Sequence, residues 1–216
     1  MAEKWRTIKL EDIDPIPVAG GKLLWQPLRR TLDIGAFGIN AYVAPNAGDD
    51  VVEEHTEQTF GHEEVYAVLS GHATFTLDEE TLDAPAGTIV FVRDPAVKRH
   101  ARANEDGTAV LAIGGPRGGA FVPSSWEDSY FAAEKHRHSG DYDAMVAELS
   151  DGLGRHPDDP AMLYDLACAE ARAGRPEDAL DHLRRALGLK PEWADHARGD
   201  EDLVSLRERP DWPLAG

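Results

Sequence analysis

Residues 62–77 read HEEVYAVLSGHATFTL. Two short runs in this stretch, Val65–Leu69 and Ala73–Leu77, are rich in β-branched and aromatic residues, and Gly71 lies between them as a turn signal. In the second run, threonine alternates with apolar residues, as in a strand that buries one of its faces. The stretch therefore predicts two strands joined by a tight connection.

Similar apolar runs recur on both sides of this stretch, and turn signals rich in Pro, Gly, Asn and Asp separate them. The further runs cover residues 23–25, 37–43, 88–92 and 109–113. Many short strands with frequent turns are typical of an all-β sandwich or barrel. We therefore expect residues 1–122 to form a β-barrel domain.

The sequence changes character after Pro123. It becomes rich in Ala, Leu, Glu and Arg, with apolar residues three and four positions apart. Leu180, Leu183 and Leu187 show this spacing, which places an apolar stripe along one side of a helix. A second, all-α domain is therefore expected over residues 126–216, and the overall class is α+β.

The helical part repeats with a period of 34 residues. The matching pairs are Gly140 and Gly174, Leu149 and Leu183, Leu153 and Leu187, and Pro157 and Pro191. A helix–turn–helix unit of this length resembles the tetratricopeptide repeat, although Glu170 stands where that family usually has an aromatic residue. The resemblance implies a groove for a protein or peptide partner. The alternative is that the helices only pack on the barrel or on a second subunit.

The β half resembles a cupin domain. In residues 62–75, Glu64 and Gly71 are spaced as in the later part of the first cupin motif. Residues 85–92, which read PAGTIVFV, resemble the second motif together with Pro95 and His100. The resemblance implies a small antiparallel β-barrel of jelly-roll type.

Cupins usually hold a divalent metal with two histidines and a glutamate of the first motif and one histidine of the second. The resemblance places Glu64 at the carboxylate position and His100 near the second-motif histidine. This sequence lacks the usual histidine pair, and His55 and His62 are the nearest substitutes. Residues two apart share a face of a strand, so His62 and Glu64 can face inward together.

The expected metal ligands are therefore His55, His62, Glu64 and His100, and Glu57 can complete a rearranged site because it shares a face with His55. Imidazole and carboxylate ligands suit Fe, Mn, Ni, Cu or Zn. The competing interpretation is that this acidic run is a solvated surface. The sequence assigns no catalytic residue and no other cofactor.

Three functions follow from these patterns. The first is a barrel that binds a small molecule or a metal, coupled to a helical interaction or dimerisation module. The second is a metal-dependent cupin enzyme, an oxygenase, isomerase or hydrolase acting on a small organic substrate. The third is a barrel filled by side chains. The missing histidine pair favours the first over the second. We also expect a homodimer, because the strand edge near residues 23–28 needs a cover.

The amino-acid composition narrows the classes of partner that the protein can bind. With 40 acidic and 22 basic residues, the formal net charge is -18, which disfavours nucleic acid and anionic membranes as partners. No apolar run approaches the roughly 20 residues of a membrane helix. The charged N-terminus and the single cysteine, Cys168, predict a cytoplasmic protein. Cys168 lies on an apolar helical stripe and is expected in the core.

Overall fold

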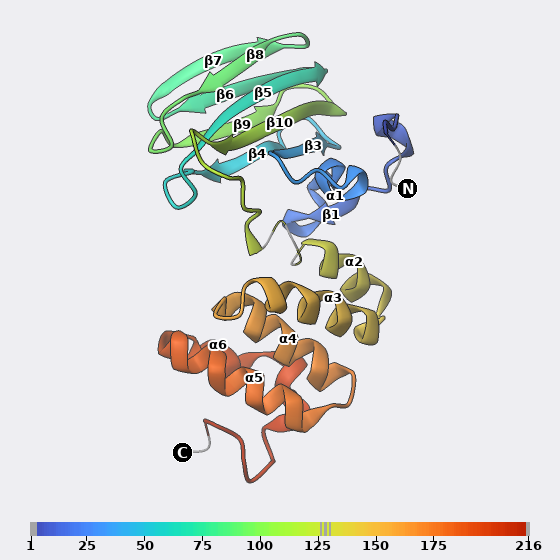
Figure 1. Cartoon of the computed structure of the whole chain (residues 1–216), viewed down its shortest axis with the longest axis vertical. Coiled ribbons are helices and arrows are strands. Elements are labelled where there is room, and N and C mark those ends of the chain that lie inside the picture. The colour runs from blue at the N-terminus through green and yellow to red at the C-terminus, as the bar shows by residue number, and fades with distance from the viewer. Residues whose placement is uncertain (1–3, 126, 128, 130, 215–216) are drawn as a thin grey trace. The chain divides into compact units, whose positions relative to one another are not determined.

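The computed structural model describes residues 4–125, 127, 129 and 131–214, and it separates into two compact units, Met1–Pro123 and Ser124–Gly216 (Figure 1). The first unit is built mainly of strands and the second of helices. Positions 126, 215 and 216, which limit the expected helical domain, lie outside the described residues. None of the described helices is both long enough and apolar enough to cross a membrane.

Two antiparallel sheets form the β unit. One has six strands in the order β1-β2-β3-β10-β5-β8, and the other has four in the order β4-β9-β6-β7. The strands are β1 (Ile16–Val18), β2 (Leu23–Gln26), β3 (Gly38–Ala44), β4 (Asp50–His55), β5 (His62–Ser70), β6 (His72–Leu77), β7 (Glu80–Pro85), β8 (Ile89–Val92), β9 (Arg99–Ala103) and β10 (Thr108–Pro116). Two 3-10 helices, η1 (Leu10–Asp12) and η2 (Ala19–Gly21), and helix α1 (Leu28–Leu32) accompany the N-terminal strands.

The strands from β3 to β10 have the order of a jelly roll. Four of them form the series β3-β10-β5-β8 within the larger sheet, and the other four form β4-β9-β6-β7. This double Greek-key arrangement closes two four-stranded sheets around one core. The expected jelly roll followed by helices is therefore confirmed.

The core lies between the two sheets, and burial alternates along the strands that face it. In β9, Ala101 and Ala103 are buried, while Arg102 between them is exposed. Tyr66 of β5 and Phe75 of β6 meet across the core with ring centroids 5.6 Å apart. Burial of a ring such as that of Phe75 contributes about 2–3 kcal/mol to folding.

The connection between β5 and β6 requires glycine. Gly71 has a φ of 71°, in the left-handed region, and a Cβ added there would lie 2.5 Å from Thr108 Oγ1. The Thr108 hydroxyl accepts from the backbone N–H of His72 at 3.2 Å and lies 2.7 Å from the carbonyl oxygen of Glu105, to which it can donate, so its position is fixed. Only a residue without a side chain fits this turn.

The strand edge that was expected to need a second subunit is covered within the chain. Strand β2 pairs with β1 on one side, with Trp25 opposite Ile16, and with β3 on the other, with Trp25 opposite Tyr42. Strand β2 therefore presents no free edge, the sheet ends at β1, and the homodimer stays a prediction.

Consecutive helices pack on one another in the second unit. They are α2 (Phe131–Ser139), α3 (Tyr142–Arg155), α4 (Pro160–Arg172), α5 (Pro176–Leu189) and α6 (Ala194–Gly199), with 3-10 helices η4 (Pro191–Trp193) and η5 (Glu201–Leu206). Pro160 and Pro176 begin α4 and α5, where a missing N–H costs nothing. Asp159 caps α4 by accepting from Met162 N. The helices are as expected, whereas their assignment to tetratricopeptide repeats stays a prediction.

Candidate metal centre

Polar side chains gather at one end of the barrel, where strands of both sheets meet. His55 ends β4 and lies opposite Arg99, the first residue of β9. His62, Glu64 and Tyr66 are alternate residues of β5 and therefore share its inner face. Glu57, in the loop between β4 and β5, completes the cluster and is buried.

Three side chains bring potential metal-binding atoms together. His55 Nε2 lies 3.6 Å from Glu57 Oε1 and 3.7 Å from Glu64 Oε2. One ligand atom from each of the three residues lies within 4.8 Å of the other two. The histidine and both carboxylates can therefore reach a common point.

The tautomer of His55 favours coordination. Its Nδ1 lies 2.7 Å from the backbone carbonyl oxygen of Glu53, which can only accept, so Nδ1 carries the hydrogen. The neutral ring then has its lone pair on Nε2, the atom that faces Glu57 and Glu64. Burial lowers the pKa of His55, but Glu64, the Glu53 carbonyl and Glu57 together raise it above its usual value.

Glu64 has one hydrogen-bond donor, Tyr66, and one neighbouring cation, Arg99, deeper in the barrel. The Tyr66 hydroxyl donates to Glu64 Oε2, and Arg99 Nε lies 3.5 Å from the same oxygen. Burial raises the pKa of Glu64, but His55, Tyr66 and Arg99 together lower it below its usual value. Burial also raises the pKa of Tyr66 well above its usual value, and the neighbouring Glu64 adds to that effect. Glu64 is thus an oriented carboxylate.

His62 lies beside the three-residue group and contacts it through Glu57. His62 Nδ1 is 3.0 Å from Glu57 Oε2. Its ring lies between Phe60 and Phe121, with centroids 5.5 Å away in each case. These contacts orient His62 toward Glu57. In this position His62 can hold the Glu57 carboxylate in place as a neighbour of a metal ligand.

His100 does not belong to this cluster, so its expected role as a ligand is corrected. It alternates with the buried Arg99 and Ala101 of β9 and therefore points away from the core. Its Nε2 lies 2.8 Å from Asp50 Oδ1, and Asp50 is itself partly exposed. The inward position expected for His100 is taken by Arg99, one residue earlier.

Gly114 leaves room for the Glu64 side chain. It lies opposite Glu64 in the β5–β10 register. A Cβ added at Gly114 would be 3.0 Å from Glu64 Cγ and 3.5 Å from Glu64 Oε1. The absence of a side chain there lets the carboxylate lie over the neighbouring strand.

Distances and charge both fit a divalent metal. Two ligand atoms about 2.1 Å from one tetrahedral ion lie about 3.4 Å apart. The separations from His55 Nε2, 3.6 and 3.7 Å, are close to that value and longer than ordinary hydrogen bonds. In addition, among the described residues the carboxylates of Glu57 and Glu64 share the cluster with the guanidinium of Arg99, so a dication would offset the remaining negative charge.

The sequence contained signals that could place three further residues at this site, namely Glu57, Tyr66 and Arg99. Glu57 was expected only as a member of a rearranged site. Tyr66 follows Glu64 by two residues, so strand alternation alone places it on the same face. Arg99 could have been found in the same way, because it alternates with the small apolar residues Ala101 and Ala103.

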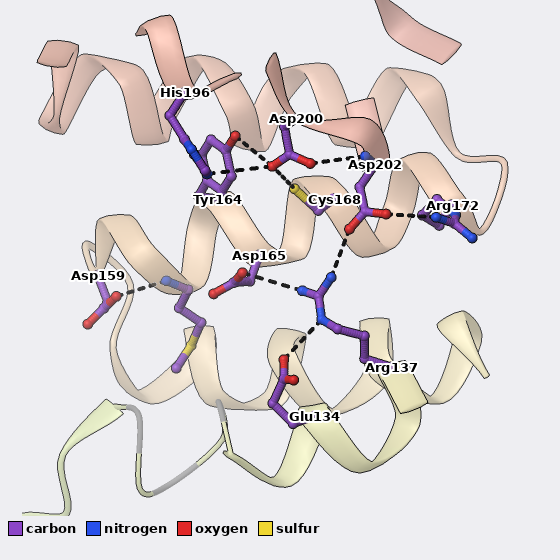
Figure 2. Close-up of polar contacts among 11 residues, drawn as sticks. Glu134, Arg137, Asp159, Tyr164, Asp165, Cys168, Arg172, His196, Asp200 and Asp202 are labelled. Atoms are coloured by element: carbon purple, nitrogen blue, oxygen red, sulfur yellow. Dashed lines mark hydrogen bonds and ion pairs between the residues drawn. The ribbon is translucent and has the colours of Figure 1, made fainter. Parts of the chain in front are cut away.

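A second polar cluster lies within the helical unit (Figure 2). Cys168, Asp200 and Asp202 have potential ligand atoms within 4.8 Å of one another. These groups already have partners in the chain. The Tyr164 hydroxyl donates to Asp200 at 2.9 Å, and Arg137 and Arg172 each donate to Asp202 at 2.8 Å. The cluster therefore acts as a polar network that ties η5 to α2 and α4.

Cys168 in this network is a buried thiol. It is 2% exposed, as expected of a core residue, and its Sγ lies 3.7 Å from Asp200 Oδ2. Burial raises the pKa of Cys168, and the nearby Asp200 and Asp165 raise it further. A raised pKa disfavours the thiolate, which is the form in which a cysteine acts as a nucleophile.

Replacing Asp165 by asparagine should weaken the pH dependence of the helical unit's stability. Burial raises the pKa of Asp165 from 3.8 to about 7, against the opposing effect of Arg137. Because the folded state then binds the proton more tightly, this group's stabilisation is complete below pH 3.8 and is lost as the pH rises through 7. From pH 5 to pH 8 the wild type should lose about 2–3 kcal/mol that Asp165→Asn does not lose. Urea unfolding of both proteins at the two pH values measures this, and equal losses would contradict it.

Comparisons with known proteins give structural likenesses only. No protein-family model and no curated protein matches the sequence. The chain is similar to a cupin protein from Bacteroides fragilis, with 21% identity, 57% of this chain and 93% of that chain covered, and a TM-score of 0.41. It is also similar to a sugar phosphate isomerase of the cupin superfamily from Silicibacter pomeroyi, with 14% identity, coverages of 52% and 76%, and a TM-score of 0.44.

A third similar structure is described as a predicted oxalate decarboxylase from Thermotoga maritima. It is 18% identical, with 52% of this chain and 100% of that chain covered and a TM-score of 0.43. The first two of these structures are thus cupin proteins. The assignment of the β unit to the jelly-roll class rests on its own strand order.

Proposed function

We propose that the barrel is a binding module that holds a divalent transition metal through His55, Glu57 and Glu64. The observation that carries this proposal is the convergence of one imidazole and two carboxylates, with ligand atoms within 4.8 Å of one another. Three protein ligands leave further coordination positions for a small molecule with an oxygen or nitrogen donor. The ligand class is therefore a small polar organic molecule.

The donor set narrows the choice of metal. One histidine with two carboxylates is harder than the three-histidine set of many zinc sites and contains no thiolate. Among Fe, Mn, Ni, Cu and Zn, such a set best suits Mn and Fe. A bound metal would act as a Lewis acid and polarise the ligand that it holds.

The helical unit would serve this barrel as an interaction or dimerisation module of tetratricopeptide type. The support is the period of 34 residues in the sequence and the succession of packed helices from α2 to α5. A protein or peptide is the partner class that such repeats bind.

A metal-dependent enzyme is the second candidate, an oxygenase, isomerase or hydrolase. Its support is the same three-ligand set, because catalytic metal sites commonly keep a position open for the substrate. The two candidates differ in outcome. The enzyme converts its ligand, whereas the binding module releases the ligand unchanged.

Metal analysis tests the site. Protein purified without a histidine tag and reconstituted with Mn²⁺ or Fe²⁺ should contain close to one metal ion per chain by elemental analysis. His55→Ala and Glu64→Gln should each weaken the affinity for the metal by at least about tenfold and thereby lower the metal content, because ligand loss typically costs that much or more in affinity.

His100→Ala is the matched control, because this histidine lies on the outer face and pairs with Asp50. It should retain the full metal content. A wild type without stoichiometric metal after reconstitution, or equal losses in His55→Ala and His100→Ala, would refute the assignment.

A further inference from the structure

After its last strand the chain stays against the end of the barrel. Strand β10 ends at Pro116, and a tight turn follows in which Gly119 N donates to the carbonyl oxygen of Pro116 at 3.4 Å. We use the name exit segment for residues 117–123. Within it Val122 is 61% exposed, whereas its neighbour Phe121 is partly buried, so Phe121 is the one that faces the protein.

Phe121 rests in a notch that a glycine leaves in the larger sheet. A Cβ added at Gly38 of β3 would lie 3.1 Å from Phe121 Cε2 and 3.2 Å from Phe121 Cζ. Gly38 lies opposite Gly114 of β10, and Gly114 lies opposite Glu64 of β5. Residues directly opposite each other share a face of an antiparallel sheet. Phe121 therefore rests on the same inner face as the Glu64 carboxylate.

The ring of Phe121 also packs beside the imidazole of His62. The two ring centroids are 5.5 Å apart at an interplanar angle of 32°, and Phe60 lies at the same distance from His62 at an angle of 26°. The His62 side chain is 12% exposed. A closely packed imidazole between two rings has little freedom to change its rotamer, so its Nδ1 stays directed at Glu57 Oε2, 3.0 Å away.

The support from Phe121 comes from outside the loop that carries Glu57. The Glu57 carbonyl oxygen accepts from Phe60 N at 3.1 Å and from Gly61 N at 2.7 Å, so Phe60 belongs to the same turn as Glu57. Phe121 instead rests on β3, a strand of the barrel. The contact between Phe121 and His62 therefore ties the Glu57 loop to the sheet.

We infer that Phe121 is a positioning residue of the metal centre. Its ring, seated in the Gly38 notch, holds His62 against Glu57 and thereby keeps the Glu57 carboxylate directed toward the other proposed ligands. The role in metal binding rests on the proposed function, whereas the bracing of the loop is a property of the protein without metal. Loss of a group that orients a metal ligand typically weakens metal binding about 10- to 100-fold. Because Phe121 acts through one further residue, we expect the lower end of this range.

Hydrogen exchange of the metal-free protein tests the bracing. In Phe121→Ala, peptides that cover residues 56–61 should exchange roughly tenfold faster, because the loop opens more often without its aromatic contact. Gly38→Val should act in the same direction, because it fills the notch and displaces the ring while Phe121, His62 and Glu57 stay unchanged. Gly38 lies in a strand and outside the left-handed region, so its backbone accepts valine. The double variant should exchange no faster than Phe121→Ala, because Gly38→Val acts only through the ring.

Calorimetric titration with Mn²⁺ tests the role in metal binding. Phe121→Ala should weaken the affinity about tenfold. Phe121→Leu is the conservative variant and should recover most of this loss, because leucine keeps an apolar side chain in the notch. The electron paramagnetic resonance spectrum of bound Mn²⁺ reports the arrangement of its ligands. It should differ from the wild type in Phe121→Ala and agree with it in Phe121→Leu.

Val122→Ala is the matched control, because Val122 lies next to Phe121 in the exit segment and its side chain is in solvent. It should match the wild type in exchange, affinity and spectrum. Unchanged exchange of residues 56–61 in Phe121→Ala overturns the bracing. An equal acceleration in peptides from β6 and β7 overturns it as well, because the whole barrel would then be loosened and not this loop.

The metal site and the positioning role can fail separately. A wild type that binds no Mn²⁺ refutes the metal site, and the exchange of the metal-free variants then still decides whether Phe121 braces the loop. A wild type that binds Mn²⁺ with an affinity that Phe121→Ala leaves unchanged overturns the positioning role alone.

Discussion

Replacing Arg99 by methionine should destabilise the barrel by about 3 kcal/mol, because it removes one member of a buried ion pair and leaves the other member uncompensated. The Arg99 side chain is fully buried, and the Glu64 side chain is 12% exposed. The Arg99 guanidinium also donates to the backbone carbonyl oxygens of Pro95 and Asp94, at 3.4 and 3.5 Å. Urea unfolding followed by hydrogen exchange of peptides from β5 and β9 measures the loss in the barrel itself.

Arg102→Met is the control for this prediction. Arg102 lies on the same strand, but its side chain is 60% exposed and is 3.6 Å from the partly exposed Asp50. Such surface pairs contribute less than about 1 kcal/mol, so this variant should unfold nearly as the wild type does. If the two variants lose the same stability, Arg99 is not an essential partner of Glu64.

Strand β9 shows what the alternation of residues could predict, and how the resemblance to a family motif led to a different expectation for His100. Residues 99–103 read RHARA, and their alternation places Arg99 with the two alanines on the buried face. Strand parity alone would have put His100 outside. The resemblance to the second cupin motif placed it inside instead, because a family motif gives a residue type and approximate position but not the face of the strand.

The positions of His55 and Glu57 depend on features that have no sequence period, namely a register shift and a loop. The β4–β9 register shifts between Val52 and His55, so counting along the strand does not predict the direction of His55. Glu57 lies in a loop, and its own backbone N–H donates to the carbonyl oxygen of Pro95 at 2.9 Å. By contrast, His62 and Glu64 lie on a regular strand, and their shared inner face follows from the spacing of two.

In the helical unit, the sequence predicted local structure better than tertiary contacts. Pro160 and Pro176 begin helices, as their missing N–H groups favour. The partners of Arg137 lie 3, 28 and 65 positions away, and only the first, Glu134, follows from helical spacing. The contacts with Asp165 and Asp202 depend on how α2, α4 and η5 pack.

Replacing Arg137 by methionine should destabilise the helical unit by about 2–3 kcal/mol, less than for a fully buried pair because the side chain is partly exposed. Its guanidinium lies 2.9 Å from Glu134, 3.5 Å from Asp165 and 2.8 Å from Asp202 (Figure 2). Without it, three carboxylates remain together, and of the ion pairs among the described residues the one between Arg172 and Asp202, at 2.8 Å, is kept. Urea unfolding with hydrogen exchange of peptides from α4 and η5 measures the loss.

The loss should also depend on pH, in a direction that distinguishes repulsion from lost packing. At pH 8 the remaining carboxylates are charged and repel one another, whereas at pH 5 the raised pKa of Asp165, about 7, keeps that group neutral. Arg137→Met should therefore cost more stability at pH 8 than at pH 5. Arg198→Met is the control, because Arg198 pairs with Asp195 at 2.5 Å on an exposed surface, and it should cost less than about 0.5 kcal/mol at both pH values. An Arg137→Met loss that is the same at both pH values would mean that Arg137 acts by packing its aliphatic stem and not by neutralising the carboxylates that join η5 to α2 and α4.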